Sequence, residues 1–227
     1  MKLFTFHFSG GSKYSFRDLQ ANISEAVEVI NLELPGRGSR INEPLLYSFK
    51  EMLSDIHGQI RVDSGEPFAL YGHSLGAYLA YESAVNLNKA GGNMPVRLFV
   101  SGVNAPTIKR QFDEIPDDKT FLENLLSMGG IPHEVANNQD MLDFCLPILK
   151  ADFTGLSSYK CSNHKLDMPI TVFAGDKDST YERGLNKWAE LTNAATEINL
   201  YSGNHFFIYE HGPDIGFEIS SRLLYGC

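Results

Sequence analysis

The stretch Phe68-Ala-Leu-Tyr-Gly-His-Ser-Leu-Gly-Ala77 leads from apolar residues to a serine that stands between two glycines. Its first four residues are typical of a buried strand, and Ala77–Lys89 has the apolar spacing of a helix. A strand that turns into a helix through Gly-x-Ser-x-Gly indicates a nucleophile elbow, in which a strained turn exposes the serine hydroxyl. The alternative is a serine in an ordinary loop of small residues. We interpret Ser74 as a nucleophile.

On both sides of this stretch, short β-rich segments alternate with segments of helical periodicity. This alternation predicts a mostly parallel sheet with helices on both faces, and the elbow specifies the α/β-hydrolase fold within that α/β class. The expected strands are Leu3–Phe8, Ala26–Glu33, Phe68–Tyr71, Val96–Ser101, Ile170–Ala174 and Glu197–Tyr201. The expected helices are Phe16–Ile23, Leu46–Val62, Ala77–Lys89, Tyr181–Thr192 and Pro213–Leu223.

Residues 113–165 interrupt the alternation with amphipathic helical sequence and no clear strand. We expect one domain, residues 1–227, with this insertion as a helical lid over the strand ends, where open α/β sheets bind ligands. A small subdomain that only packs is the alternative. Four of its apolar residues are candidates for lining a substrate pocket, with core packing as the alternative: Leu125, Met128, Met141 and Phe144.

A serine nucleophile needs a histidine base oriented by a carboxylate, and in this fold the chain order is serine, acid, histidine. Asp178 follows the expected strand Ile170–Ala174, and His205 follows the expected strand Glu197–Tyr201. We predict that these two residues complete the triad. Asp176 is the alternative acid and His211 the alternative base.

Two backbone N–H groups must face the developing oxyanion. One is expected from Leu75, which follows the nucleophile, and the other from Ser9, in the loop His7-Phe-Ser-Gly-Gly-Ser12 after the first strand. The glycines of this loop allow the backbone to approach a substrate closely, although they also suit an ordinary turn.

The 227 residues carry a formal net charge of −9, which disfavours binding to nucleic acid or to an anionic membrane. No apolar run is long enough to span a bilayer, and the start of the chain does not resemble a secretory signal. The three cysteines show no metal-binding spacing, so we expect reduced thiols, a cytoplasmic location and no bound metal.

The chain resembles the stand-alone type II thioesterases that accompany nonribosomal peptide and polyketide synthases. The similarity covers essentially the whole chain and rests on HFSGGS, ELPGRGSR, GHSLGA, the lid segments IPDDKTFLENLLSMGGIP and LPILKADFTGLSSYK, GDKD, and GNHFFI. The lid segments are more diagnostic than the elbow motif, which all α/β-hydrolases share. Three residues depart from the family pattern: Ser9, Leu75 and Asn204 stand where alanine, methionine, and glycine or aspartate are common.

The resemblance implies hydrolysis of acyl thioesters on the phosphopantetheine arm of carrier proteins, without a metal or redox cofactor. We expect a monomer that contacts its acidic partner through a local basic or apolar patch. The basic candidates are Arg37, Arg40, Lys109, Arg110 and Lys150, although solvated surface charge is the better interpretation of any single one of them. The alternative functions are a small carboxylesterase or lipase, an acyltransferase, and a non-catalytic binding protein of the same fold.

Overall fold

The computed structural model describes all residues except 109–116, 128–136, 179–183 and 227. Six parallel strands form one sheet in the order β2-β1-β3-β4-β5-β6. The strands are β1 (Lys2–Phe6), β2 (Glu28–Asn31), β3 (Phe68–His73), β4 (Leu98–Ser101), β5 (Ile170–Gly175) and β6 (Thr196–Tyr201). Each coincides with an expected strand to within two residues at either end, and the predicted α/β-hydrolase fold is confirmed.

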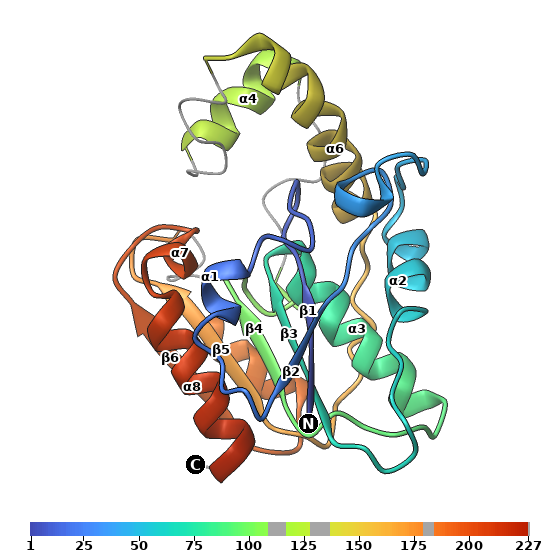
Figure 1. The fold of residues 1–227 in the computed structure, drawn as a ribbon, viewed down its shortest axis with the longest axis vertical. Helices are drawn as coiled ribbons and strands as arrows, with labels where there is room; N and C mark the ends of the chain where they lie inside the picture. Colours follow the sequence, from blue (N-terminus) through green and yellow to red (C-terminus); the bar gives the residue numbers. More distant parts are fainter. Residues whose placement is uncertain (109–116, 128–136, 179–183, 227) are drawn as a thin grey trace.

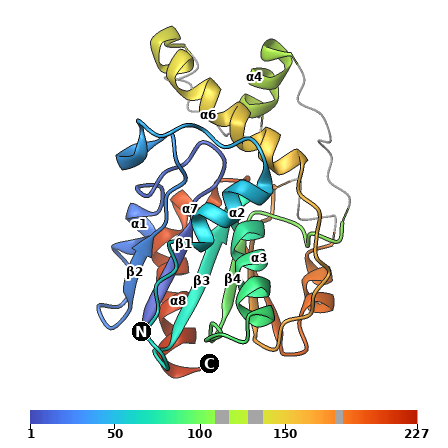
Figure 2. The same ribbon diagram turned by 90° about the vertical axis from the view of Figure 1, so that its right-hand side faces the viewer.

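Helices cover both faces of the sheet (Figures 1 and 2). On one face lie α2 (Phe49–His57), α3 (Leu75–Lys89) and the 3₁₀ helix η3 (Leu185–Leu191). On the other lie α1 (Arg17–Gln20), α7 (Phe207–Glu210) and α8 (Gly212–Tyr225). A further 3₁₀ turn, η1 (Gly38–Arg40), lies in the loop after β2. The central strands are buried on both faces, which explains their continuous apolar sequences.

Three helical predictions differ from the structure. The expected helix Phe16–Ile23 is reduced to the four residues of α1. The expected helix Tyr181–Thr192 is a 3₁₀ helix over its described part, and it begins only after Gly184, whose φ of +114° does not suit a helix. The expected helix Leu46–Val62 is shorter, because Ser48 caps α2 by accepting a hydrogen bond from the Glu51 N–H, and α2 ends before Gly58.

The inserted segment contains α4 (Asp118–Ser127) and α6 (Gln139–Ser157), which lie beyond the carboxyl ends of the strands (Figure 1). The two helices share a small apolar cluster of Phe121, Leu125 and Leu149. The end of α6 packs against α2, where the Ser158 hydroxyl accepts a hydrogen bond from the Phe49 N–H at 2.9 Å. The insertion is therefore attached to the sheet domain through the second half of α6. Among the described residues, no helix combines the length and apolar character needed to cross a membrane.

Candidate active site

The turn between β3 and α3 holds Ser74 in a strained conformation. Its φ of 55° and ψ of −119° are rare for a residue with a side chain. Two glycines make this possible: a Cβ at Gly72 would lie 2.2 Å from the Gly76 carbonyl oxygen, and a Cβ at Gly76 would lie 2.0 Å from that of Phe6. The strand, turn and helix predicted for a nucleophile elbow are all present, and Ser74 is partly exposed.

His205 and Asp178 meet at the carboxyl edge of the sheet. The Asp178 carboxylate accepts a hydrogen bond of 2.8 Å from the His205 Nδ1–H, and both residues are buried. This bond fixes the tautomer that leaves Nε2 of His205 as the acceptor. Among the described residues, no hydrogen bond joins Ser74 to His205. Such contacts are often long before a substrate binds.

The two alternative residues make other contacts. Asp176 accepts a hydrogen bond of 2.9 Å from the Gly203 N–H, in the loop after β6. The Nε2 of His211 lies 2.9 Å from the Ser202 carbonyl oxygen, at the start of α8. Asp178 and His205, rather than these two residues, therefore form the acid–histidine pair.

His73, inside the elbow, is fully buried, and its ring centroid lies 4.9 Å from that of His205. Its Nδ1 lies 2.7 Å from the Ser101 hydroxyl at the end of β4. Burial and the neighbouring His205 hold the pKa of His73 well below its usual value. His73 is therefore a neutral packing partner of the His205 ring. The sequence did not indicate the contact to Ser101, because it depends on the register of β3 and β4.

The predicted oxyanion loop is a tight turn. The Gly11 N–H donates to the Phe8 carbonyl oxygen at 2.9 Å, and Gly10 has a φ of +77°, as the third position of a type II turn requires. Neither the Ser9 N–H nor the Leu75 N–H donates a hydrogen bond to any of the described residues. Both predicted donors are thus free to bind a substrate oxygen.

The three described pocket candidates have two different environments. Leu125 is buried between α4 and α6. Met141 and Phe144 are 48% and 59% exposed and line, with Cys145, an open hollow of about 340 Å³ on α6. Met128 lies outside the described residues. Whether any of them contacts substrate stays a prediction.

Two of the proposed docking residues have internal partners. Arg37 is buried against Asp152, and Arg40 forms ion pairs with Glu43 and Asp55. Neither is therefore available as a free docking charge. Lys109 and Arg110 lie outside the described residues. Cys145 and Cys161 are free thiols, and Cys227 is also outside the described residues.

A strained serine elbow at the end of a parallel sheet, with a bonded aspartate–histidine pair beside it, defines an α/β-hydrolase of the serine type. A model of the thioesterase domain family matches residues 1–222, and the chain belongs to this family.

Three relatives make the assignment more specific. The gramicidin S biosynthesis protein GrsT of Aneurinibacillus migulanus is 34% identical over 216 residues, which cover 92% of this chain and 84% of GrsT. The crystal structure of ClbQ, from the colibactin pathway of nonribosomal peptide and polyketide synthesis, superimposes with a TM-score of 0.89 at 27% identity, covering 98% and 96% of the two chains. BorB, the type II thioesterase from the borrelidin cluster, gives 0.86 at 27% identity, covering 98% and 92%. The predicted resemblance to type II thioesterases is confirmed.

Proposed function

We propose that this thioesterase hydrolyses acyl groups from the phosphopantetheine arm of carrier proteins, with Ser74 as nucleophile, His205 as general base and Asp178 as its orienting carboxylate. The observation that carries the proposal is the hydrogen bond between His205 and Asp178 at the same sheet edge as the strained Ser74 turn. A carboxylate bound to Nδ1–H stabilises the imidazolium that forms during proton transfer.

In the first half of the reaction, His205 Nε2 takes the proton from Ser74 as its oxygen attacks the thioester carbonyl carbon. The N–H groups of Ser9 and Leu75 stabilise the oxyanion of the tetrahedral intermediate. The intermediate collapses by breaking the carbon–sulfur bond, and the pantetheine sulfur leaves as a thiol with the proton from His205. In the second half, His205 removes a proton from water, which hydrolyses the acyl–serine ester and regenerates Ser74. This chemistry uses only the residues of the chain and water.

The carrier-protein substrate is supported by the relatives. GrsT is named for gramicidin S biosynthesis, and ClbQ and BorB come from the colibactin and borrelidin pathways. We accordingly propose a cytoplasmic monomer that acts on acyl or peptidyl carrier domains of a synthase.

The test compares an acyl–carrier-protein thioester with a p-nitrophenyl ester of the same acyl chain, in the wild type and in Ser74→Ala. We expect hydrolysis of the thioester to be strongly preferred and Ser74→Ala to lower kcat about a thousandfold or more, because the nucleophile is lost. Preference for the oxygen ester would indicate a carboxylesterase. If neither substrate is hydrolysed and no serine-directed phosphonate labels Ser74, the chain is a binding protein and the proposal is wrong.

A further inference from the structure

An arginine–aspartate pair is buried beside the oxyanion loop. Asp152 lies in α6 and is completely buried, and Arg37, in the loop after β2, is 3% exposed. The guanidinium binds both carboxylate oxygens, from Nη1 at 2.5 Å and from Nη2 at 2.8 Å. Removing two charges from water is costly, and such a pair often adds little to stability. Stability alone therefore does not account for this pair.

The third partner of Asp152 indicates a further role. Its Oδ2 also accepts a hydrogen bond of 2.7 Å from the Gly10 N–H, within the turn that contains Ser9. A type II turn differs from a type I turn mainly in the orientation of its central peptide, here Ser9–Gly10. The carboxylate therefore holds the peptide that directly follows the free Ser9 N–H. Arg37 Nη1 lies 3.5 Å from the Gly11 carbonyl oxygen, at the end of the same turn.

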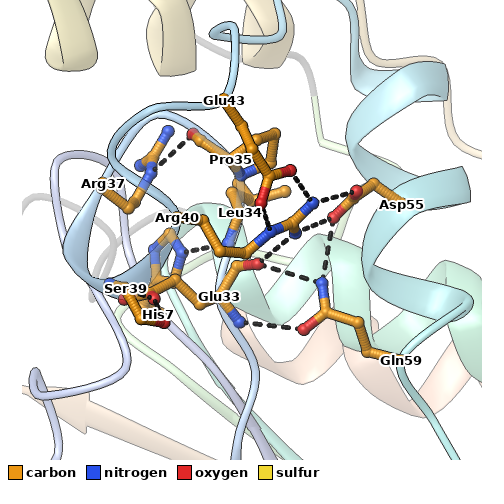
Figure 3. Close-up of polar contacts among 10 residues, drawn as sticks. All are labelled: His7, Glu33, Leu34, Pro35, Arg37, Ser39, Arg40, Glu43, Asp55 and Gln59. Atoms are coloured by element: carbon orange, nitrogen blue, oxygen red, sulfur yellow. Dashed lines mark hydrogen bonds and ion pairs between the residues drawn. The ribbon is translucent and has the colours of Figure 1, made fainter.

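The loop that carries Arg37 is itself held in place (Figure 3). Arg37 Nε donates to the Pro35 carbonyl oxygen at 3.4 Å, and Arg40 anchors the loop to α2 through Asp55. His7 joins this loop to β1: its Nδ1–H donates to the Phe8 carbonyl oxygen at 2.9 Å, and its Nε2 accepts from the Leu34 N–H at 3.3 Å. Arg37 thus has little freedom to move away from Asp152.

We propose that Asp152 and Arg37 are positioning residues that hold the Ser9–Gly10 peptide, and so aim the Ser9 N–H at the oxyanion. The inference rests on the proposed function, in which Ser9 supplies one of the two donors. Because Asp152 belongs to α6, the same contact links the inserted helices to the catalytic turn. Any displacement of α6 that separates Asp152 from Gly10 would release the turn.

Two double variants separate positioning from stability. Arg37→Met with Asp152→Leu removes both charges and the acceptor for Gly10, whereas Arg37→Met with Asp152→Asn removes the charges but retains an acceptor oxygen. Because the whole pair is replaced, we expect both to keep a Tm near that of the wild type. We expect kcat for an acyl–carrier-protein thioester to fall at least about tenfold in the leucine variant, with KM unchanged. The asparagine variant should recover kcat to within about threefold.

The Gly10 amide provides a readout that does not depend on turnover. Its NMR signal should be protected from hydrogen exchange in the wild type and in the asparagine variant, and should lose this protection in the leucine variant. If the leucine variant loses protection but keeps the wild-type kcat, the inference is overturned. It is also overturned if kcat falls equally in both double variants, because the acceptor would then be irrelevant.

A single variant covers the case in which the double variants fail to fold. Asp152→Asn alone keeps the acceptor and leaves the Arg37 charge unpaired, so Tm should fall while kcat stays within about threefold of the wild type. A fall of kcat together with Tm would overturn the inference. Failure of the proposed function is distinguishable, because the wild type itself would then show no Ser74-dependent turnover, whereas the Gly10 amide would still report its bond to Asp152.

Discussion

At the residue scale, Ser74 combines backbone strain with contacts that hold it in place. A non-glycine residue in such a conformation costs on the order of 1–3 kcal/mol, which the surrounding structure must offset. The Ser74 N–H donates to the Ser101 carbonyl oxygen at 2.9 Å, and its own carbonyl accepts from the Ala77 N–H at 3.0 Å. The strain persists because β4 and α3 fix both sides of the residue.

Ser74, Asp178 and His205 were predictable because each follows a recognisable strand, and parallel strands bring their carboxyl ends to one edge. Arg37 and Asp152 were not, because 115 residues separate them and their sequence context resembles that of surface charges. Only the packing of α6 onto the loop after β2 brings them together. The choice of Asp178 over Asp176 agrees with the contact to His205, although the catalytic role itself stays a proposal.

Ser9 offers a test of whether its backbone or its side chain acts. Its hydroxyl oxygen is buried and has no hydrogen-bond partner among the described residues. Ser9→Ala should therefore raise the free energy of unfolding by about 1 kcal/mol, because a buried unsatisfied group is removed. Urea unfolding and steady-state kinetics check this, with kcat expected to be unchanged because the N–H remains. A fall in kcat of more than about threefold would mean that the hydroxyl takes part in the reaction.

At the element scale, the strands were more predictable than the helices. Strands β3, β4 and β5 are buried along their whole length, and their largely apolar sequences predict their bounds to within two residues. The short helices α1 and α7, of four residues each, lack a side-chain cap and depend on tertiary contacts. The helix α7, directly after His205, was not predicted at all. The segment Tyr181–Thr192 has the apolar spacing of a helix, but its described part has the tighter winding of η3.

The helix α3 and the strand β1 approach each other closely at Gly76. A Cβ at Gly76 would lie 2.0 Å from the Phe6 carbonyl oxygen, and backbone atoms cannot yield as a flexible side chain can. Gly76→Ala should lower the free energy of unfolding by about 3 kcal/mol, at the upper end of overpacking effects. It should also slow the labelling of Ser74 by a phosphonate.

Gly92→Ala is the matched control for this substitution, because the nearest atom to a Cβ there is the Leu87 carbonyl oxygen at 3.7 Å. Thermal unfolding and labelling rates of both variants are compared with the wild type. Equal stability of the two variants would show that α3 can move away from β1 without cost, contrary to the close packing of Gly76 against the Phe6 carbonyl oxygen.

At the scale of the whole molecule, two buried neutral histidines, His7 and His73, make the fold sensitive to acid. Burial, followed by the nearby Arg37 charge, lowers the pKa of His7 from 6.5 to about 4. The unfolded chain therefore binds a proton at this residue as the pH falls below 6.5, while the folded chain does not until about pH 4. The stability that neutral His7 contributes to the fold is fully present above pH 6.5, and it is lost as the pH falls from 6.5 to about 4.

His7→Gln isolates this contribution. Between pH 7 and pH 5 the wild type should lose about 2 kcal/mol more unfolding free energy than the variant, because glutamine does not titrate. The variant should be less stable at pH 7, since its contacts to Phe8 and Leu34 are altered. Urea unfolding at both pH values checks the difference, with Gly92→Ala as a control that retains both histidines. Parallel losses in the wild type and His7→Gln would contradict the assignment.

The contact between His73 and His205 also decides where a hydrogen ion can reside during turnover. The ring centroids of the two imidazoles lie 4.9 Å apart. Burial and the neighbouring His205 hold the pKa of His73 well below its usual value, so in the proposed mechanism the hydrogen ion taken from Ser74 stays on the His205 ring, which is bonded to Asp178. The proposed mechanism therefore returns this hydrogen ion to the departing sulfur and does not pass it to His73.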